Sequence, residues 1–301
     1  MTLTSRLVTV IVSSAIVSSA LPIDARQRAT REREVLISVL DKNDKPADGV
    51  GVADLVLKED GVAREILRVE HSSAPLQVLV LLDTSAGTQL LIPDVRKGVQ
   101  VLAGTLWGQA PDTEIGLMEF GERPMQLADF SRSATLLDKG LNRLAQHTGS
   151  GAYLLEAVSD AAKALKKHEA KRPVIVVFTM ESSPEFSSLT SQRIEDTLKA
   201  ANNPSLWAIE LHQSGSQPGT SDEDRQRNIV VGDVTTRSGG VREAVLDKMN
   251  IEAAFAKLGE RLTSRYAVTY SRPESIIPPS KLEVTLKRAG LRLLAPRWSG
   301  Q

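Results

Sequence analysis

The chain has 301 residues, contains no cysteine, and carries 37 basic and 37 acidic residues, so its formal net charge is zero. This balance gives no overall electrostatic attraction to nucleic acid or to an anionic membrane, and we expect neither as a general partner. The absence of cysteine excludes disulfides, thiolate metal sites and a cysteine nucleophile. A hydrophobic content of 41% over this length is sufficient for a sizeable core, in one large domain or two smaller ones.

The first 20 residues have the pattern of a secretory signal peptide. A positive charge at Arg6 precedes an apolar stretch, and the small residues Ser18 and Ala20 suit the −3 and −1 positions of a cleavage site. The apolar stretch is short for a membrane-spanning helix. We therefore expect cleavage near Ala20, a secreted or periplasmic protein, and membrane attachment only if the segment stays uncleaved. The charged residues 21–33 then form a solvated linker.

Both ends of the remaining chain have β texture. In residues 34–72, short apolar runs are separated by turn-rich stretches, and Asp60 and Gly61 join two of these runs as in a β-hairpin. Residues 265–301 contain a strand at 266–270 and alternating apolar and polar residues from Leu282 onward. Each set of strands is too small to be stable alone, so we expect the N-terminal and C-terminal β segments to pack together.

Residues 74–264 alternate apolar strands with amphipathic helices. Continuous apolar runs, which suit strands covered on both faces, occur at 78–82 and 173–179, and residues 205–211 are expected to form the last central strand. Apolar residues at helical spacing predict helices around 91–106, 134–144, 154–165, 194–198 and 251–262. Strands joined through helices pair in parallel by right-handed crossovers. The expected fold class is therefore α/β, a doubly wound and mostly parallel sheet with small flanking β segments.

Two stretches depart from this alternation. Residues 113–120 and 124–130 form two strands separated by a short turn, which predicts antiparallel neighbours at a sheet edge. Residues 212–227 are polar, and we expect a long solvated loop there. The carboxylates between Ser221 and Arg225 lack the glycine and the distal glutamate of a calcium-binding loop.

Polar residues follow the buried strands at the points where those strands end. Asp83 and Ser85 follow the first strand, Glu181 follows the strand at 173–179, and Ser150 lies in a glycine-rich segment before a helix. The carboxyl ends of parallel strands lie at one edge of the sheet, and ligands of such sheets bind outside that edge. We therefore expect these residues to converge there.

The segments "DTSAG" from Asp83, "TGSGAY" around Ser150 and "FTMESS" through Met180 resemble the three metal-site loops of von Willebrand factor type A domains. The opening "VLISVLDKNDKPADGVGVADLVLKEDGVAREI" and the closing "RLTSRYAVTYSRP" and "LEVTLKRAGLRL" resemble the flanks of a large bacterial group of secreted proteins related to that domain. The resemblance covers almost the whole expected mature chain. It implies an exported, non-enzymatic module that binds a protein ligand through the loop surface.

The resemblance also implies a metal site. In the family, the first loop has Asp-x-Ser-x-Ser, the second supplies a threonine and the third an aspartate, and together they hold Mg²⁺ while a carboxylate of the partner completes the shell. This chain keeps Asp83 and Ser85 in the first loop but has Gly87 in place of the second serine. Ser150 replaces the threonine, and Met180 stands where the aspartate belongs.

A thioether is a poor ligand for a hard cation, whereas Mg²⁺ prefers oxygen. Glu181, next to Met180, is the carboxylate that could substitute for the missing aspartate. The candidate metal ligands are therefore Asp83, Ser85, Ser150 and Glu181, in a degenerate site that holds no metal or binds Mg²⁺ weakly. The alternative interpretation is that Asp83 and Ser85 only cap the following helix or bond backbone amides in the strand-to-helix turn.

Two other classes of function remain open on the sequence. One is a secreted α/β hydrolase or a nucleotide-using enzyme, because one fold supports many activities. However, neither Ser85 nor Ser150 lies in a Gly-x-Ser-x-Gly elbow, and the glycine-rich segment lacks the Lys-Ser/Thr of a phosphate-binding loop. The four histidines also lack metal-binding spacing. The other class is a structural envelope protein with a vestigial ligand site.

Overall fold

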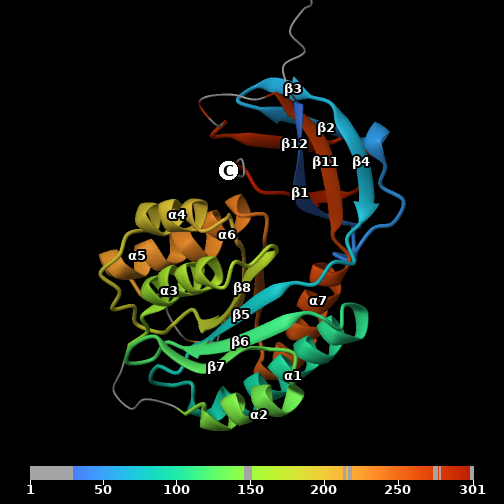
Figure 1. Cartoon of the computed structure of the whole chain (residues 1–301). Coiled ribbons are helices and arrows are strands. Elements are labelled where there is room, and N and C mark those ends of the chain that lie inside the picture. Colours follow the sequence, from blue (N-terminus) through green and yellow to red (C-terminus); the bar gives the residue numbers. More distant parts are fainter. Residues whose placement is uncertain are drawn as a thin grey trace, which may run out of the picture.

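The computed structural model describes residues 30–145, 151–212, 215, 219–273, 277 and 279–298 (Figure 1). It contains a six-stranded sheet flanked by helices, together with a four-stranded and a three-stranded sheet. The expected signal peptide at residues 1–20 and the start of the expected linker lie outside the described residues. Within the described part of the chain, the helices are too short or too polar to cross a membrane.

The six-stranded sheet has the order β10-β9-β8-β5-β6-β7 and is parallel except for the pair β6 and β7. Its strands are β5 (Gln77–Leu82), β6 (Glu114–Glu119), β7 (Met125–Ser131), β8 (Pro173–Met180), β9 (Ser205–Leu211) and β10 (Arg242–Val245). The expected α/β class is confirmed, and so is the antiparallel pair at the sheet edge. Strands β8 and β9 are buried along their whole length, although β9 contains the polar residues Ser205 and Glu210.

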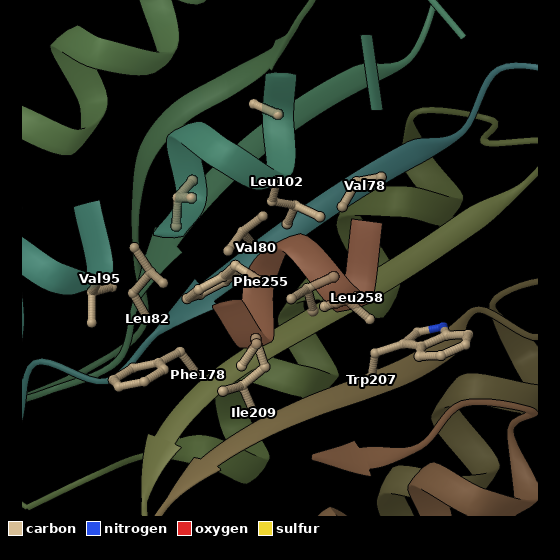
Figure 2. Close-up of a cluster of buried hydrophobic side chains, with 14 of the residues drawn as sticks. Val78, Val80, Leu82, Val95, Leu102, Phe178, Trp207, Ile209, Phe255 and Leu258 are labelled. Atoms are coloured by element: carbon tan, nitrogen blue, oxygen red, sulfur yellow. The ribbon is translucent and has the colours of Figure 1, made fainter. Parts of the chain in front are cut away.

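Helices cover both faces of this sheet, and alternate side chains of β5 define the two cores. Val78, Val80 and Leu82 pack on one face against α1 (Ile92–Gln109) and α7 (Ile251–Thr263) (Figure 2). The intervening residues Leu79 and Leu81 pack on the other face against α3 (Leu154–Lys167) and α4 (Ser191–Ala200). The other helices are α2 (Ala134–Arg143), α5 (Asp222–Ile229) and α6 (Thr235–Arg237), with a π-helical segment at Val230–Val234. We call this sheet and its helices the α/β unit.

The expected loop at 212–227 is wrong in its second half, because α5 begins at Asp222. Ser221 and Asp224 form a reciprocal capping box: the Ser221 hydroxyl accepts from the Asp224 amide at 3.0 Å, and the Asp224 carboxylate accepts from the Ser221 amide at 3.0 Å. This box satisfies amides that the first helical turn leaves unpaired. The helix is almost entirely polar, so it has no apolar stripe from which to predict it.

The remaining strands form two small antiparallel sheets, which we call the β unit. The first has the order β13-β1-β11-β4 and the second the order β12-β2-β3. Their bounds are β1 (Thr30–Leu40), β2 (Leu55–Glu59), β3 (Val62–Arg64), β4 (Ile66–His71), β11 (Tyr266–Pro273), β12 (Leu282–Leu286) and β13 (Arg292–Leu294). Strands from the two ends of the chain therefore lie side by side, and β1 pairs antiparallel with β11.

Two local features of the β unit follow from its backbone. The hairpin predicted at Asp60 and Gly61 is confirmed: Glu59 pairs with Val62, and both turn residues have positive φ, as a tight two-residue turn requires. The linker expected up to residue 33 is too long, because β1 already begins at Thr30. Residues 31–33 are charged, but residues 30–33 pair with β11, so the partner strand determines their conformation.

Candidate functional site

Asp83 is the centre of a hydrogen-bond cluster at the carboxyl edge of the central sheet. It follows β5, is buried, and accepts on Oδ1 from the amide and hydroxyl of Ser85 at 2.9 and 2.6 Å. Its Oδ2 accepts from the hydroxyls of Thr179 and Ser183 at 3.0 and 2.8 Å, and from the Met180 amide at 3.3 Å. The loops after β5 and β8 therefore converge, as expected, and their donors surround this carboxylate.

The neighbouring residues of the first loop are also fixed inside the protein. Ser85 is fully buried, and its hydroxyl lies 3.0 Å from that of Ser183. The Thr84 hydroxyl accepts from the Gly121 amide at 3.0 Å, and a Cβ on Gly121 would lie 2.7 Å from the same oxygen. Only glycine allows this approach of the loop after β6 to the first loop.

The two positions that depart from the family pattern are neighbours in space. Met180 is buried in the core that α1 and α7 cover, and its methyl group would lie 3.9 Å from a Cβ added to Gly87. Gly87 itself has a φ of +96°, a conformation that disfavours a serine there. A thioether packed on a glycine thus occupies the region for which the resemblance predicts two oxygen ligands.

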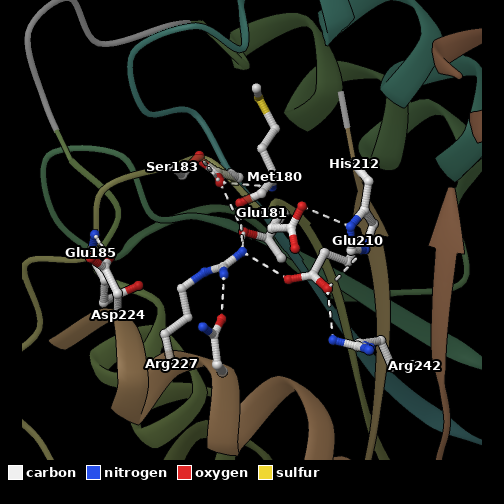
Figure 3. A network of polar contacts seen from close by, with 12 residues as sticks. Met180, Glu181, Ser183, Glu185, Glu210, His212, Asp224, Arg227 and Arg242 are labelled. Carbon is white, nitrogen blue, oxygen red and sulfur yellow. Dashed lines mark hydrogen bonds and ion pairs between the residues drawn. The ribbon is translucent and has the colours of Figure 1, made fainter. Parts of the chain in front are cut away.

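Glu181 does not join this cluster. Its Oε2 lies 2.8 Å from His212 Nδ1, and Nε2 of the same imidazole lies 3.2 Å from Glu210 Oε2 (Figure 3). Glu210 also pairs with Arg242 at 3.2 Å. The structure therefore brings Asp83 and Ser85 together and directs the carboxylate of Glu181 toward β9 and the residue after it. Ser150 lies outside the described residues.

Arg227 of α5 places a buried positive charge beneath the third loop, and the sequence interpretation missed it. Its Nη2 donates to the Met180 carbonyl at 2.5 Å and to the Thr179 hydroxyl at 3.1 Å, and lies 3.2 Å from Glu210 Oε1 (Figure 3). The arginine therefore holds the loop after β8 against β9 from below. The capping pattern at Ser221 was the one local sign that a helix could present this side chain.

Glu185 is a second functional candidate that the sequence did not indicate. Burial raises the pKa of its carboxyl group to about 8, so the group is mainly protonated at neutral pH. Its Oε1 accepts from the amide of Leu154, the first residue of α3, at 3.0 Å, and also from the Ser187 amide and hydroxyl. Its Oε2 is buried with no hydrogen-bond partner among the described residues. The neutral acid thus links the third loop to the start of α3.

The residues present fit a magnesium ion poorly. Both oxygens of Asp83 are engaged by protein donors, Met180 offers no oxygen, and Glu181 is paired with His212. Mg²⁺ requires oxygen ligands in a near-octahedral array and releases its water reluctantly. In the described part of the chain, no three histidine, aspartate or glutamate side chains are grouped so that they could hold a metal ion.

Comparison with known proteins identifies the central segment. Residues 78–181, from β5 to the start of the third loop, match the family model of the von Willebrand factor type A domain. No curated protein matches the chain. The solved structures that resemble it include a von Willebrand factor type A protein from Catenulispora acidiphila, with 10% identity over 86% of this chain and 71% of that one and a TM-score of 0.48.

Two further solved structures are similar to part of this chain. BatB from Bacteroides thetaiotaomicron, a conserved hypothetical protein, has 13% identity over 63% of this chain and 100% of that one, with a TM-score of 0.44. The von Willebrand factor domain of the type V pili tip protein Mfa5 from Porphyromonas gingivalis has 11% identity over 62% of this chain and 95% of that one, with a TM-score of 0.45.

Proposed function

We propose that this chain is an exported, non-enzymatic protein that binds another protein through the loops at the carboxyl edge of its central sheet. The support is that residues 78–181 match the family model of the von Willebrand factor type A domain, which is typically a protein-interaction module. We further propose that this binding uses no divalent metal ion, or depends on one only weakly. The loops involved follow β5, β8 and β10.

The observation that carries the proposal is the exposure of large apolar side chains on these loops. Leu90 after β5 is 78% exposed, Phe186 after β8 is 53% exposed, and Leu246 and Met249 after β10 are 76% and 81% exposed. Apolar and aromatic side chains that project into water from one end of a molecule are typical of protein-binding surfaces. We call these four residues the apolar edge.

The contacts of Asp83 support recognition without a metal. In a metal-dependent site, the cation bridges the domain to a carboxylate of the partner. Here Asp83 is buried under donors of its own loops, and Arg227 supplies positive charge from below. A partner then meets side chains of the apolar edge rather than a cation, and affinity comes from shape and desolvation.

The same contacts support a non-enzymatic role. Ser85 is buried with its hydroxyl donated to Asp83, so it does not reach a substrate as a nucleophile. His212 lies between two carboxylates rather than beside a serine. A hydrolase needs a nucleophile and a base in contact at an accessible position.

Export and membership of the bacterial secreted group rest on the sequence. The support is the signal-like pattern of residues 1–20 and the resemblance of the flanking β segments. Mass spectrometry of the mature protein, purified from the producing cell, tests export directly. We expect an N-terminus near residue 21, and a retained Met1 in a cytosolic fraction would contradict it.

Binding is tested by crosslinking the full chain in the envelope fraction of the producing cell and quantifying captured proteins. We compare wild type, a Leu246→Ser/Met249→Ser double variant, and Val62→Ser, an exposed apolar position in the β unit that serves as a matched control. We expect a defined partner that the double variant loses and the control keeps, with and without chelator. Equal capture by all three proteins would contradict the proposed surface, and loss on chelation would contradict metal independence.

A further inference from the structure

A cavity of about 310 Å³ lies at the junction of the two units, at the opposite edge of the central sheet from Asp83. It is lined by residues of β1, by the amino ends of β8 and β9, and by Ser238 after α6. None of the loops of the proposed protein-binding surface contributes to it.

The cavity contains an arginine that has no carboxylate partner among the residues that the structure describes. Arg265 lies where the chain crosses from α7 to β11 and is 4% exposed. Its Nη1 donates to the Ser205 hydroxyl and its Nη2 to the Leu36 carbonyl, both at 3.3 Å, which is long for a hydrogen bond, and both acceptors are neutral. Its Nε is buried and has no hydrogen-bond partner among the described residues.

The other buried arginines of the described chain each have a carboxylate partner. Arg227, Arg261 and Arg272 each contact a glutamate: Glu210 at 3.2 Å, Glu243 at 2.8 Å and Glu59 at 2.5 Å respectively. Pairing of this kind is the usual condition for burying a charge, because an uncompensated ion in the interior is strongly destabilising. Arg265 is the exception within the part of the chain that the structure describes.

A second residue that lines the cavity has a side-chain donor without an acceptor in the described part of the chain. Trp298 is 4% exposed, and its Nε1 has no hydrogen-bond partner among the described residues. Arg172 adds positive charge on the rim, where Glu34 pairs with it at 2.9 Å. Burial, together with the charge of Arg172, lowers the pKa of Arg265 to about 10, so the guanidinium remains charged at neutral pH.

We propose that this cavity binds a small anion whose carboxylate or phosphate group accepts hydrogen bonds from Arg265. A guanidinium presents a planar array of donors that matches the oxygens of either group. Water in the cavity could satisfy the donors but would leave the charge unbalanced. The volume is at the small end of ligand-binding pockets, so the anion is a small molecule rather than a macromolecule.

Binding would also join the two units. The side chain of Arg265 contacts β1 of the β unit and β9 of the α/β unit. The carbonyl of Arg265 accepts a hydrogen bond at 2.8 Å from the amide of Ser72, which lies at the other point where the chain passes between the two units. An anion bound to Arg265 would therefore contact residues of both units. We therefore expect the folded chain to be stabilised by the bound anion.

The test is a calorimetric titration of the full chain with inorganic phosphate and, separately, with succinate, each against sodium chloride at equal ionic strength. We expect saturable binding of at least one probe and a rise in unfolding temperature. The stronger probe tells a phosphate ligand from a carboxylate ligand. In Arg265→Gln, the dissociation constant should rise about ten- to hundredfold, as for loss of a charged hydrogen bond. Arg132→Gln, an exposed arginine paired with Asp112 far from the cavity, serves as the control and should bind as wild type does.

A second variant covers the case in which Arg265→Gln does not fold. Trp298→Phe keeps an aromatic side chain but removes the Nε1 donor. We expect the fold to be retained and the dissociation constant to rise several-fold. Two outcomes would overturn the proposal: no saturable binding of either probe beyond chloride, or equal affinity in wild type and in every folded cavity variant.

Discussion

Asp83 shows how a single carboxylate can hold two loops together. The donors of Ser85, Thr179, Ser183 and the Met180 amide all converge on it inside the protein. Asp83 accepts from the Ser85 amide in the strand-to-helix turn, as the alternative interpretation expects, but it also accepts from three hydroxyl groups. The hydroxyls of Thr179 and Ser183 and the Met180 amide extend its contacts to the third loop. The role of Asp83 in the fold follows from these contacts whether or not a partner is present.

The first prediction concerns the substitution Asp83→Asn. The amide would turn an NH₂ group toward donors that now face a carboxylate oxygen, so we expect the free energy of unfolding to fall by about 2 to 3 kcal/mol. Urea unfolding measures this difference. Asp112→Asn, at an exposed aspartate, is the control and should change stability little. A loss as small as that of the control would show that the cluster does not depend on the charge of Asp83.

The second prediction concerns the pH dependence that Glu185 produces. Its pKa is raised by burial to about 8 in the folded chain, from 4.5 for an exposed glutamate. Between these pH values the folded state holds a proton that the unfolded state has lost. The free energy of unfolding therefore decreases as pH rises through this window, by at most about 1.4 kcal/mol per pH unit, and levels off above pH 8.

Glu185→Gln mimics the protonated acid and does not titrate. We expect its stability relative to wild type to improve steadily between pH 5 and pH 8, measured by urea unfolding at fixed ionic strength. Glu122→Gln, at an exposed glutamate, should keep the wild-type profile. An unchanged difference between wild type and Glu185→Gln across this range would contradict a buried neutral carboxyl group.

At the level of elements, helix α5 stabilises the third loop through Arg227. The helix has almost no apolar surface, yet it carries Arg227 into the interior, where the guanidinium contacts the Met180 carbonyl and Glu210. The third prediction is that Arg227→Met lowers the free energy of unfolding by about 3 kcal/mol or more, because it leaves the buried Glu210 with less compensation.

Arg225 provides a matched control for this substitution, since it lies in the same helix with an exposed side chain paired to Asp222. Arg225→Met should cost about 0.5 kcal/mol or less. Urea unfolding of both variants gives the comparison. Similar losses in the two variants would show that the buried contacts of Arg227 contribute little.

The same elements show what the sequence could and could not predict. Strands β5, β8 and β9 and the helices α1, α3 and α7 were predictable, because long apolar runs and helical stripes are local patterns that tertiary packing reinforces. Helix α5 and strand β10 were not: the first is polar, and the second has four residues, of which only Val245 is buried. Their conformation depends on capping and on the neighbouring strand.

The candidate site, like the fold, could be predicted only in part from the sequence. The convergence of the loops carrying Asp83 and Ser85 with the loop after β8 followed from parallel pairing. The direction of the Glu181 side chain could not be predicted from parallel pairing, because its carboxylate pairs with His212, which lies 31 positions further along the chain. Arg227 and Glu185 were missed for the related reason that only the folded chain brings Arg227 beneath the third loop and the Glu185 carboxyl group to the start of α3.

At the scale of the whole molecule, two surfaces with different chemistry lie at opposite edges of one sheet. At the carboxyl edge of the sheet, the loops expose the four residues of the apolar edge and bury the hydrogen-bond cluster around Asp83. The amino edge meets the β unit around a cavity with an unbalanced positive charge. The β unit is built from both ends of the chain, because β1 pairs with β11. We propose that the first surface binds a protein and the second a small anion.

The central proposal is that the loops around Asp83 bind one another and leave no strong site for a divalent cation. Calorimetric titration of the full chain with Mg²⁺ and with Mn²⁺, repeated on Asp83→Ala, tests it most directly. We predict no saturable heat for either ion in either protein. Saturable heat in the wild type that disappears in Asp83→Ala would contradict the account.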